Sequence, residues 1–221
     1  YMNTATKRPG LVSYSQGTFK NITFKGASIN YTGASEPGVA IVAAQTSGAT
    51  NFENIYIDET CEINATAVKG VAALAGRGYD GTGNISIINC AVLATINTEG
   101  TECGALAGSH WSSGITVKIK NSFSDSSKPL FGYATKALTA DSGNNYSATE
   151  DTHGTTVLTV DQMKGEAAKD NMPGLDFDFL WKTTNDYPVL RDMADRLVGW
   201  DGSIAATLEG EGTKANPYKI S

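Results

Sequence analysis

Three short patterns recur along the first two-thirds of the chain at one shared period of about 33 residues. The first is a run of small apolar residues whose large aliphatic member recurs at equal steps: Val42, Leu74 and Leu106. The second places an asparagine two residues after an apolar residue, again at nearly equal steps: Asn21, Asn54, Asn89 and Asn121. The third is the dipeptide Ile-Asn, which recurs at the same period: Ile29-Asn30, Ile63-Asn64 and Ile96-Asn97. Because these patterns interleave at one period, the chain repeats one structural unit.

Each repeat holds three short apolar segments separated by turns rich in Gly, Asn, Ser and Thr. Segments this short cannot bury a face alone, so neighbouring repeats must stack on one another. Stacking predicts that the recurring aliphatic residues form interior columns and that the four recurring asparagines form a hydrogen-bonded ladder at a bend. A shortened fourth copy follows at Leu130-Phe131-Gly132. We therefore predict an all-β fold, a right-handed parallel β-helix (β-solenoid) of about four rungs.

A β-sandwich is the alternative, because sandwich strands also recur at intervals of about 8–12 residues. Its antiparallel hairpins favour two-residue turns such as Asn-Gly or Asp-Gly. Only Asp80-Gly81 supplies such a turn between the strands of this region, and it lies inside a longer loop. The β-helix is therefore the favoured prediction.

The apolar runs resemble a motif of a known class of protein. Gly70–Gly76 (GVAALAG), followed after a polar loop by Ile87–Val92 (IINCAV), resembles the GLUG motif of bacterial extracellular parallel β-helix proteins. Glu102–Gly108 (ECGALAG) with Lys120–Ser124 (KNSFS) resembles a second copy, and the order of such segments extends the resemblance over roughly residues 19–221. Ala44 departs from the motif, which has its second glycine there. The resemblance implies a secreted or surface-displayed, adhesin-like protein, and it supplies no catalytic residues.

The periodicity stops near residue 148, which divides the chain into three predicted parts: β-helix repeats (1–148), a helix and capping segment (149–198), and a linker with the start of a following module or an edge strand (199–221). Thr159 is a good N-cap for a short helix over Val160–Asp170, which Asn171-Met172-Pro173-Gly174 would end. The alternation of apolar and acidic residues in Leu175–Trp181 predicts a half-buried edge strand. Gly199-Trp200-Asp201-Gly202 is typical of a linker. We expect the chain to be one unit of a longer protein.

Composition excludes several classes of function. Lys and Arg number 17 against 23 Asp and Glu, a net charge of −6, which argues against binding to nucleic acid. No apolar stretch approaches the roughly 18 residues of a membrane span. The three cysteines, Cys61, Cys90 and Cys103, lack the spacing of a zinc site, so no metal and no cofactor are expected. A Cys90–Cys103 disulfide is the alternative to the favoured interpretation of all three as buried thiols.

Three polar loops occupy equivalent positions in successive repeats and should stack on one side of the solenoid: Gln45–Thr50, Arg77–Gly83 and Ser109–Gly114. Two of them carry ring-bearing side chains, namely Tyr79 in one and His110 and Trp111 in the other. Sugar rings pack on aromatic faces while their hydroxyls form hydrogen bonds with nearby polar groups. These three residues are therefore the predicted binding residues, for glycans or for host or cell-surface proteins. The alternative is that Trp111 packs onto its neighbours and only stiffens the loop.

A catalytic function is the competing hypothesis. Parallel β-helices also carry polysaccharide lyases and glycoside hydrolases, and Asp176 and Asp178 would lie on one face of a strand, about 6–7 Å apart. The sequence offers no column of Lys or Arg that could abstract a proton near them, so two solvated carboxylates are the simpler interpretation. No catalytic residue is predicted. The favoured function is a non-catalytic adhesin or stalk that is extracellular or at the cell surface, with a lyase, a hydrolase or a spacer module of a larger secreted enzyme as alternatives.

Overall fold

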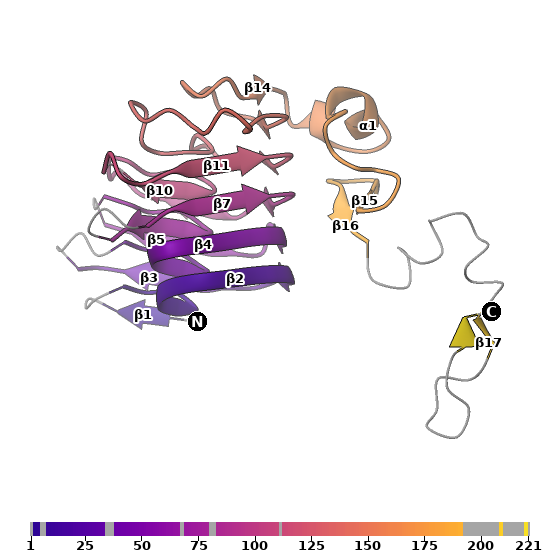
Figure 1. The fold of residues 1–221 in the computed structure, drawn as a ribbon. Coiled ribbons are helices and arrows are strands. Elements are labelled where there is room, and N and C mark those ends of the chain that lie inside the picture. Colours follow the sequence, from indigo (N-terminus) through magenta and orange to yellow (C-terminus); the bar gives the residue numbers. More distant parts are fainter. Residues whose placement is uncertain are drawn as a thin grey trace. The chain divides into compact units, whose positions relative to one another are not determined.

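Successive turns of the chain lie on one another as parallel strands and form a β-solenoid, which Figure 1 shows from the side. The computed structural model describes residues 2–4, 8–33, 38–66, 69–79, 83–110, 112–191, 208–209 and 219–220. The chain divides into two compact units, Tyr1–Val160 and Asp161–Ser221, and the first of them is the solenoid.

The solenoid has two sheets. One is a four-stranded parallel sheet in the order β1 (Met2–Thr4), β3 (Ser28–Tyr31), β5 (Glu62–Ala65) and β9 (Thr95–Asn97). The other begins with two long bent strands, β2 (Val12–Phe24) and β4 (Ala43–Ile57). Shorter strands continue it: β6 (Ala75–Gly78), β7 (Ile85–Ile88), β8 (Ala91–Val92), β10 (Ala107–Ser109), β11 (Val117–Lys120), β12 (Phe123–Ser124), β13 (Tyr146–Ser147) and β14 (Thr156–Val157).

The strand register confirms the predicted interior columns. Ile29, Ile63 and Ile96 are direct neighbours in successive turns. Ala43, Ala75 and Ala107 are aligned in the same way, so the residues before them form a second, fully buried column: Val42, Leu74 and Leu106. All strand pairs in the described part of the solenoid are parallel, which excludes the β-sandwich alternative.

The solenoid makes about three turns, and the fourth is shortened. Phe131 bridges Ala107, and the amide of Leu106 donates to the carbonyl of Leu130, so the predicted fourth copy does continue the second column. Phe123 pairs with Ala91 in the turn before it and with Tyr146 in the turn after it. Fewer residues of the chain separate Phe123 from Tyr146 than separate Ala91 from Phe123, so the last turn is shorter. A turn this short cannot supply three full-length strands, which is why the stack ends here in two-residue strands.

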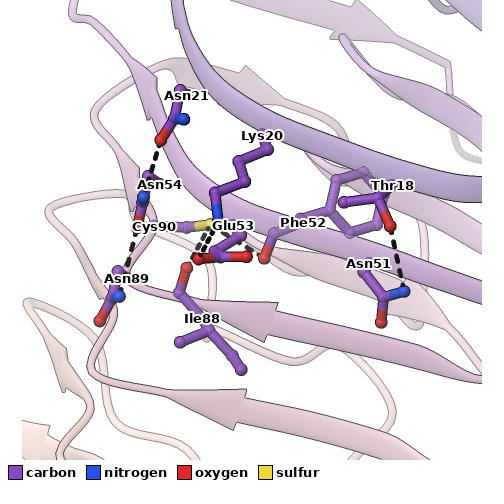
Figure 2. A network of polar contacts seen from close by, with 10 residues as sticks. All are labelled: Thr18, Lys20, Asn21, Asn51, Phe52, Glu53, Asn54, Ile88, Asn89 and Cys90. Atoms are coloured by element: carbon purple, nitrogen blue, oxygen red, sulfur yellow. Dashed lines mark hydrogen bonds and ion pairs between the residues drawn. The ribbon is translucent and has the colours of Figure 1, made fainter. Parts of the chain in front are cut away.

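The predicted asparagine ladder is present at one bend of the solenoid (Figure 2). Each side-chain amide donates to the amide oxygen of the asparagine one turn before it, at 2.8 Å from Asn54 to Asn21, 3.2 Å from Asn89 to Asn54 and 3.3 Å from Asn121 to Asn89. A fifth member, Asn144, donates to Asn121 at 3.1 Å. All five residues have φ between 51° and 58°, the left-handed region that asparagine tolerates better than most residues. The ladder therefore needs asparagine both for its side chain and for its backbone.

Replacing Asn54 by alanine is expected to lower the free energy of unfolding by about 2–3 kcal/mol. The change removes two ladder hydrogen bonds, each worth roughly 1 kcal/mol, and forces alanine into a left-handed conformation that costs about 1 kcal/mol. Urea denaturation measures the loss. Asn54→Gly should recover only the cost of the left-handed backbone, and Asn144→Ala, which loses one ladder hydrogen bond and has the same backbone conformation, should cost about 1 kcal/mol less than Asn54→Ala. Equal losses at Asn54 and Asn144 would contradict a cooperative ladder.

The three cysteines are buried thiols, and no disulfide joins Cys90 to Cys103. Burial raises the pKa of Cys61 to about 11 and that of Cys90 to about 12, and it also raises the pKa of Cys103. Thiols with such pKa values are poor nucleophiles near neutral pH, so they act here as small apolar side chains.

The second unit departs from the sequence predictions. The predicted helix over Val160–Asp170 is a 3₁₀ turn (η1, Asp161–Met163) and a short helix (α1, Ala167–Asn171), separated by Gly165 with φ of 63°. The predicted strand over 175–181 is mostly turns, and only β15 (Trp181–Lys182) pairs, antiparallel, with β16 (Val189–Leu190). The predicted linker 199–202 lies outside the described residues. Two further strands, β17 (Leu208–Glu209) and β18 (Lys219–Ile220), pair with each other.

Among the described residues, no helix has both the length and the apolar character that crossing a bilayer requires.

Candidate binding site on the flank of the solenoid

The residues that flank the three predicted loops are aligned in successive turns, but the first predicted loop, Gln45–Thr50, is part of strand β4 and not a loop. At their start Gln45, Arg77 and Ser109 are aligned, and at their end Thr50, Ile85 and Val117 are aligned. The amide of Tyr79 donates to the carbonyl of Thr46 at 2.8 Å, so the second loop is tied to the turn before it. Residues 80–82 and Trp111 lie outside the described residues, and the predicted role of Trp111 stays a prediction.

Two tyrosines from different turns meet on this flank. The rings of Tyr14 and Tyr79 lie 5.3 Å apart between centroids, with an interplanar angle of 88°. This edge-to-face arrangement is favourable because the positive edge of one ring meets the negative face of the other. The two side chains remain 43% and 38% exposed, respectively, and among the described residues Phe179 is the other ring with comparable exposure. A ligand can therefore reach both.

A guanidinium and an amide complete the arrangement. Arg8 holds its Cζ 4.3 Å from the centroid of the Tyr14 ring, and its Nε donates to Oε1 of Gln45 at 2.7 Å. Gln45 is the buried neighbour of Tyr14 in the next turn, so it fixes Arg8 against the ring. We call Arg8, Tyr14, Gln45 and Tyr79 the tyrosine site. Its guanidinium provides hydrogen-bond donors beside two exposed rings, and the buried amide of Gln45 holds that guanidinium in place.

Sequence reasoning found Tyr79 but missed Tyr14, Arg8 and Gln45 as members of this site. The signal for Tyr14 was present, since it precedes Gln45 by one repeat and thus occupies the equivalent position of the preceding turn. It was missed because the first turn lacks the run of small residues that marks this position elsewhere. Arg8 lies outside any repeat pattern, so nothing in the sequence indicated it.

The expectation that His110 is an exposed member of the site is wrong. Its side chain has 0% exposure and its Nε2 lies 3.2 Å from Oγ1 of Thr46, which is two turns away. The ring can span two turns because the residue between them is Gly78, which has no side chain. A Cβ at Gly78 would lie 3.0 Å from Cδ2 of His110 and 2.6 Å from Cδ1 of Ile115. His110 is thus an internal brace beneath the stacked loops.

This brace supports the tyrosine site from inside. The Thr46 hydroxyl that meets His110 also donates to the carbonyl of Gly83, at 3.2 Å, and the Thr46 carbonyl accepts from Tyr79. The loop that carries Tyr79 is therefore held at both ends by one residue. Burial, with a contribution from the charge of Lys136, lowers the pKa of His110 to about 3. The ring is accordingly neutral at physiological pH.

The paired carboxylates considered for catalysis do not form the expected pair. Oδ1 of Asp176 accepts the amides of Asp178 and Phe179, at 3.1 and 2.9 Å, so Asp176 closes a turn and does not alternate with Asp178 along a strand. Among the described residues, no three His, Cys, Asp or Glu side chains lie close enough to hold a metal ion.

Comparison with protein-family models, with curated proteins and with solved structures found no match to this chain.

Proposed function

We propose that this chain is a stiff, non-catalytic segment of a secreted or cell-surface protein, adhesin-like in character, that binds glycans through the tyrosine site. The observation that carries the proposal is the exposed edge-to-face pair of Tyr14 and Tyr79, held in place by Arg8 and by the stacked loops. Exposed rings beside a fixed guanidinium that can donate hydrogen bonds suit a sugar, which has apolar C–H faces and polar edges. The resemblance of the apolar runs to the GLUG motif supports the location.

The scaffold supports a role as a rigid display element. Each turn contributes backbone hydrogen bonds to both neighbouring turns, and the asparagine ladder adds side-chain bonds along the same axis. A binding site built on such strands keeps its geometry better than one on a long loop. The tyrosine site draws on residues from three turns, so it exists only while those turns are stacked.

A glycan array tests the proposal. The unaltered protein is expected to bind a subset of glycans, and Tyr79→Ala and Tyr14→Ala should each weaken that binding about tenfold, equivalent to roughly 1.4 kcal/mol of lost ring contact. Phe179→Ala is the matched control, because Phe179 is 44% exposed but belongs to the second unit. Absence of glycan binding by the unaltered protein, or equal binding by all variants, would refute the tyrosine site.

The competing catalytic function is tested with the same protein. A lyase or hydrolase would release new sugar ends from the bound polysaccharide, and a lyase would release unsaturated products. We expect neither during prolonged incubation. Cleavage that disappears in a variant of one side chain would overturn the non-catalytic assignment.

A further inference from the structure

A polar groove lies on the outside of the solenoid where the last long turn meets the shortened one. It consists of two adjoining hollows of about 530 and 210 Å³, which share the side chains of Thr116 and Thr139. The larger hollow extends toward Tyr133 and Lys136, and the smaller one runs across the outer face of β4, β7 and β11 toward Asn51. The groove therefore follows the solenoid axis over three turns.

The groove exists because the fourth turn is short. The segment 133–142 forms two tight turns in place of a full strand, closed by the amide of Lys136 donating to Tyr133 and the amide of Ser142 donating to Thr139. The amide of Thr139 also donates to the carbonyl of Val117 at 2.9 Å, which fixes this segment against β11. The wall of the larger hollow is thus anchored to the sheet.

The larger hollow contains a partly covered cation. Nζ of Lys136 donates to the carbonyl of Ser112, and among the described residues no carboxylate forms an ion pair with it. Burial lowers the pKa of Lys136, so its ammonium lacks part of the solvation it would have in water. An anion placed beside the ammonium of Lys136 would stabilise its charge in place of the missing water. The other cation of the groove, Lys118, is already paired with Asp141.

The rest of the lining combines apolar side chains, among them Ile115, Val117 and Leu138, with hydroxyl and amide groups along the path of the groove. The neutral hydrogen-bonding residues are Ser86, Ser113, Thr116, Thr135, Thr139, Thr50, Asn51, Asn84 and Tyr133. Strand β7 is paired with β4 on one side and with β11 on the other. The far edge of β11 bonds to Thr139, Ser142 and Gly143, so these strands offer no free edge to a bound peptide strand. Hydroxyl-rich ligands suit this lining better than peptides do.

We propose that this groove binds an acidic oligosaccharide, with a carboxylate or sulfate group against Lys136 and the neighbouring sugar units passing Thr116 and Thr139 into the smaller hollow. The proposal deepens the proposed glycan-binding function by naming a class of glycan, and it places that class at a site separate from the tyrosine site. A carboxylate and a sulfate present the same oxygen-borne negative charge to an ammonium, and different probes distinguish them.

Titration calorimetry with tetragalacturonate, a heparin-derived tetrasaccharide and neutral maltotetraose tests the proposal. The unaltered protein should bind at least one acidic probe and bind maltotetraose at least tenfold more weakly. Lys136→Gln should reduce binding of the acidic probe about tenfold, and Lys136→Arg should retain it. Lys128→Gln is the matched control, because Lys128 also donates to a backbone carbonyl, that of Thr98 at 2.8 Å, and does not line the groove.

The outcomes separate this proposal from the tyrosine site. Acidic binding that depends on Lys136 but not on Tyr79 supports the groove, even if the array shows no glycan that depends on Tyr79. Conversely, glycan binding that depends on Tyr79, with no acidic probe bound or with Lys136→Gln unaffected, overturns the groove alone. If Lys136→Gln and Lys128→Gln both weaken binding of the acidic probe, the binding depends on the overall charge of the protein, and the groove proposal is overturned. Thermal unfolding of each variant verifies that it is folded.

Discussion

Gly108→Ala is expected to lower the free energy of unfolding by at least about 3 kcal/mol, at the upper end of the usual cost of overpacking. A Cβ at this position would lie 2.4 Å from the carbonyl oxygen of Gly76 and 2.9 Å from Cα of Gly70. Both neighbours are backbone atoms of the adjacent turn, so no side chain can rotate away to relieve the contact. The two turns would have to separate and break the hydrogen bonds between them. Urea denaturation followed by circular dichroism measures the loss.

The equivalent position of an earlier turn supplies the control. Ala44 is aligned with Gly76 and Gly108 in the stack, and there the chain carries a Cβ naturally. Ala44→Gly should cost only the roughly 0.5–1 kcal/mol that glycine loses in a strand. A Gly108→Ala variant as stable as Ala44→Gly would show that the turns are not in the close contact described here.

The buried His110 is expected to make the solenoid less stable in mild acid. Its pKa is about 3 in the folded protein and about 6.5 when exposed, so below pH 6.5 the unfolded chain binds a proton that the folded chain does not. The stability that depends on the neutral ring is therefore complete above about pH 7 and is lost as the pH falls from 6.5 toward 3. At pH 5 the loss amounts to about 2 kcal/mol, since each pH unit below 6.5 costs about 1.4 kcal/mol.

Urea denaturation at pH 8 and pH 5 measures this loss of stability when the unaltered protein is compared with His110→Gln. The variant lacks the ionisable ring, so its stability should fall by about 2 kcal/mol less than that of the unaltered protein between the two pH values, whatever its absolute stability. His153→Gln is the control, because burial also lowers the pKa of His153 but its side chain is only partly buried and Asp151 opposes the shift. An unchanged pH dependence in His110→Gln would show that the ring is hydrated or already charged in the fold.

Predictions from the sequence were confirmed where the residues at one position of the repeat have the same structural role in every turn. The interior columns and the asparagine ladder repeat at the period of the chain, so each copy confirms the others. The alignment of Gln45, Arg77 and Ser109, at the start of the three predicted loops, followed from the same register. Prediction failed in the second unit, where no repeat exists. There the positive φ of Gly165 divides a helix that local propensity favoured, and the side chain of Asp176 closes a turn where apolar alternation predicted a strand.

The candidate sites show the same limit. Tyr79 was predicted from its loop, but its partner Tyr14 comes from a turn without the marker run, and Arg8 comes from no repeat at all. His110 was predicted at the surface because it lies in a polar loop beside Trp111. Whether a side chain in such a loop points inward depends on the space left by the residue one turn away, and here Gly78 leaves that space.

The amino-acid sequence by itself determined that this chain winds into stacked parallel turns, because only stacking buries short apolar segments that recur at a fixed period. It also determined which asparagines and aliphatic residues become vertical neighbours. The tertiary structure alone decided which polar side chains turn inward, and how Tyr14, Tyr79 and the groove of Lys136 are formed. These features depend on contacts between particular side chains of different turns. The period of the repeat shows which positions are stacked, but it does not show which side chains at those positions meet.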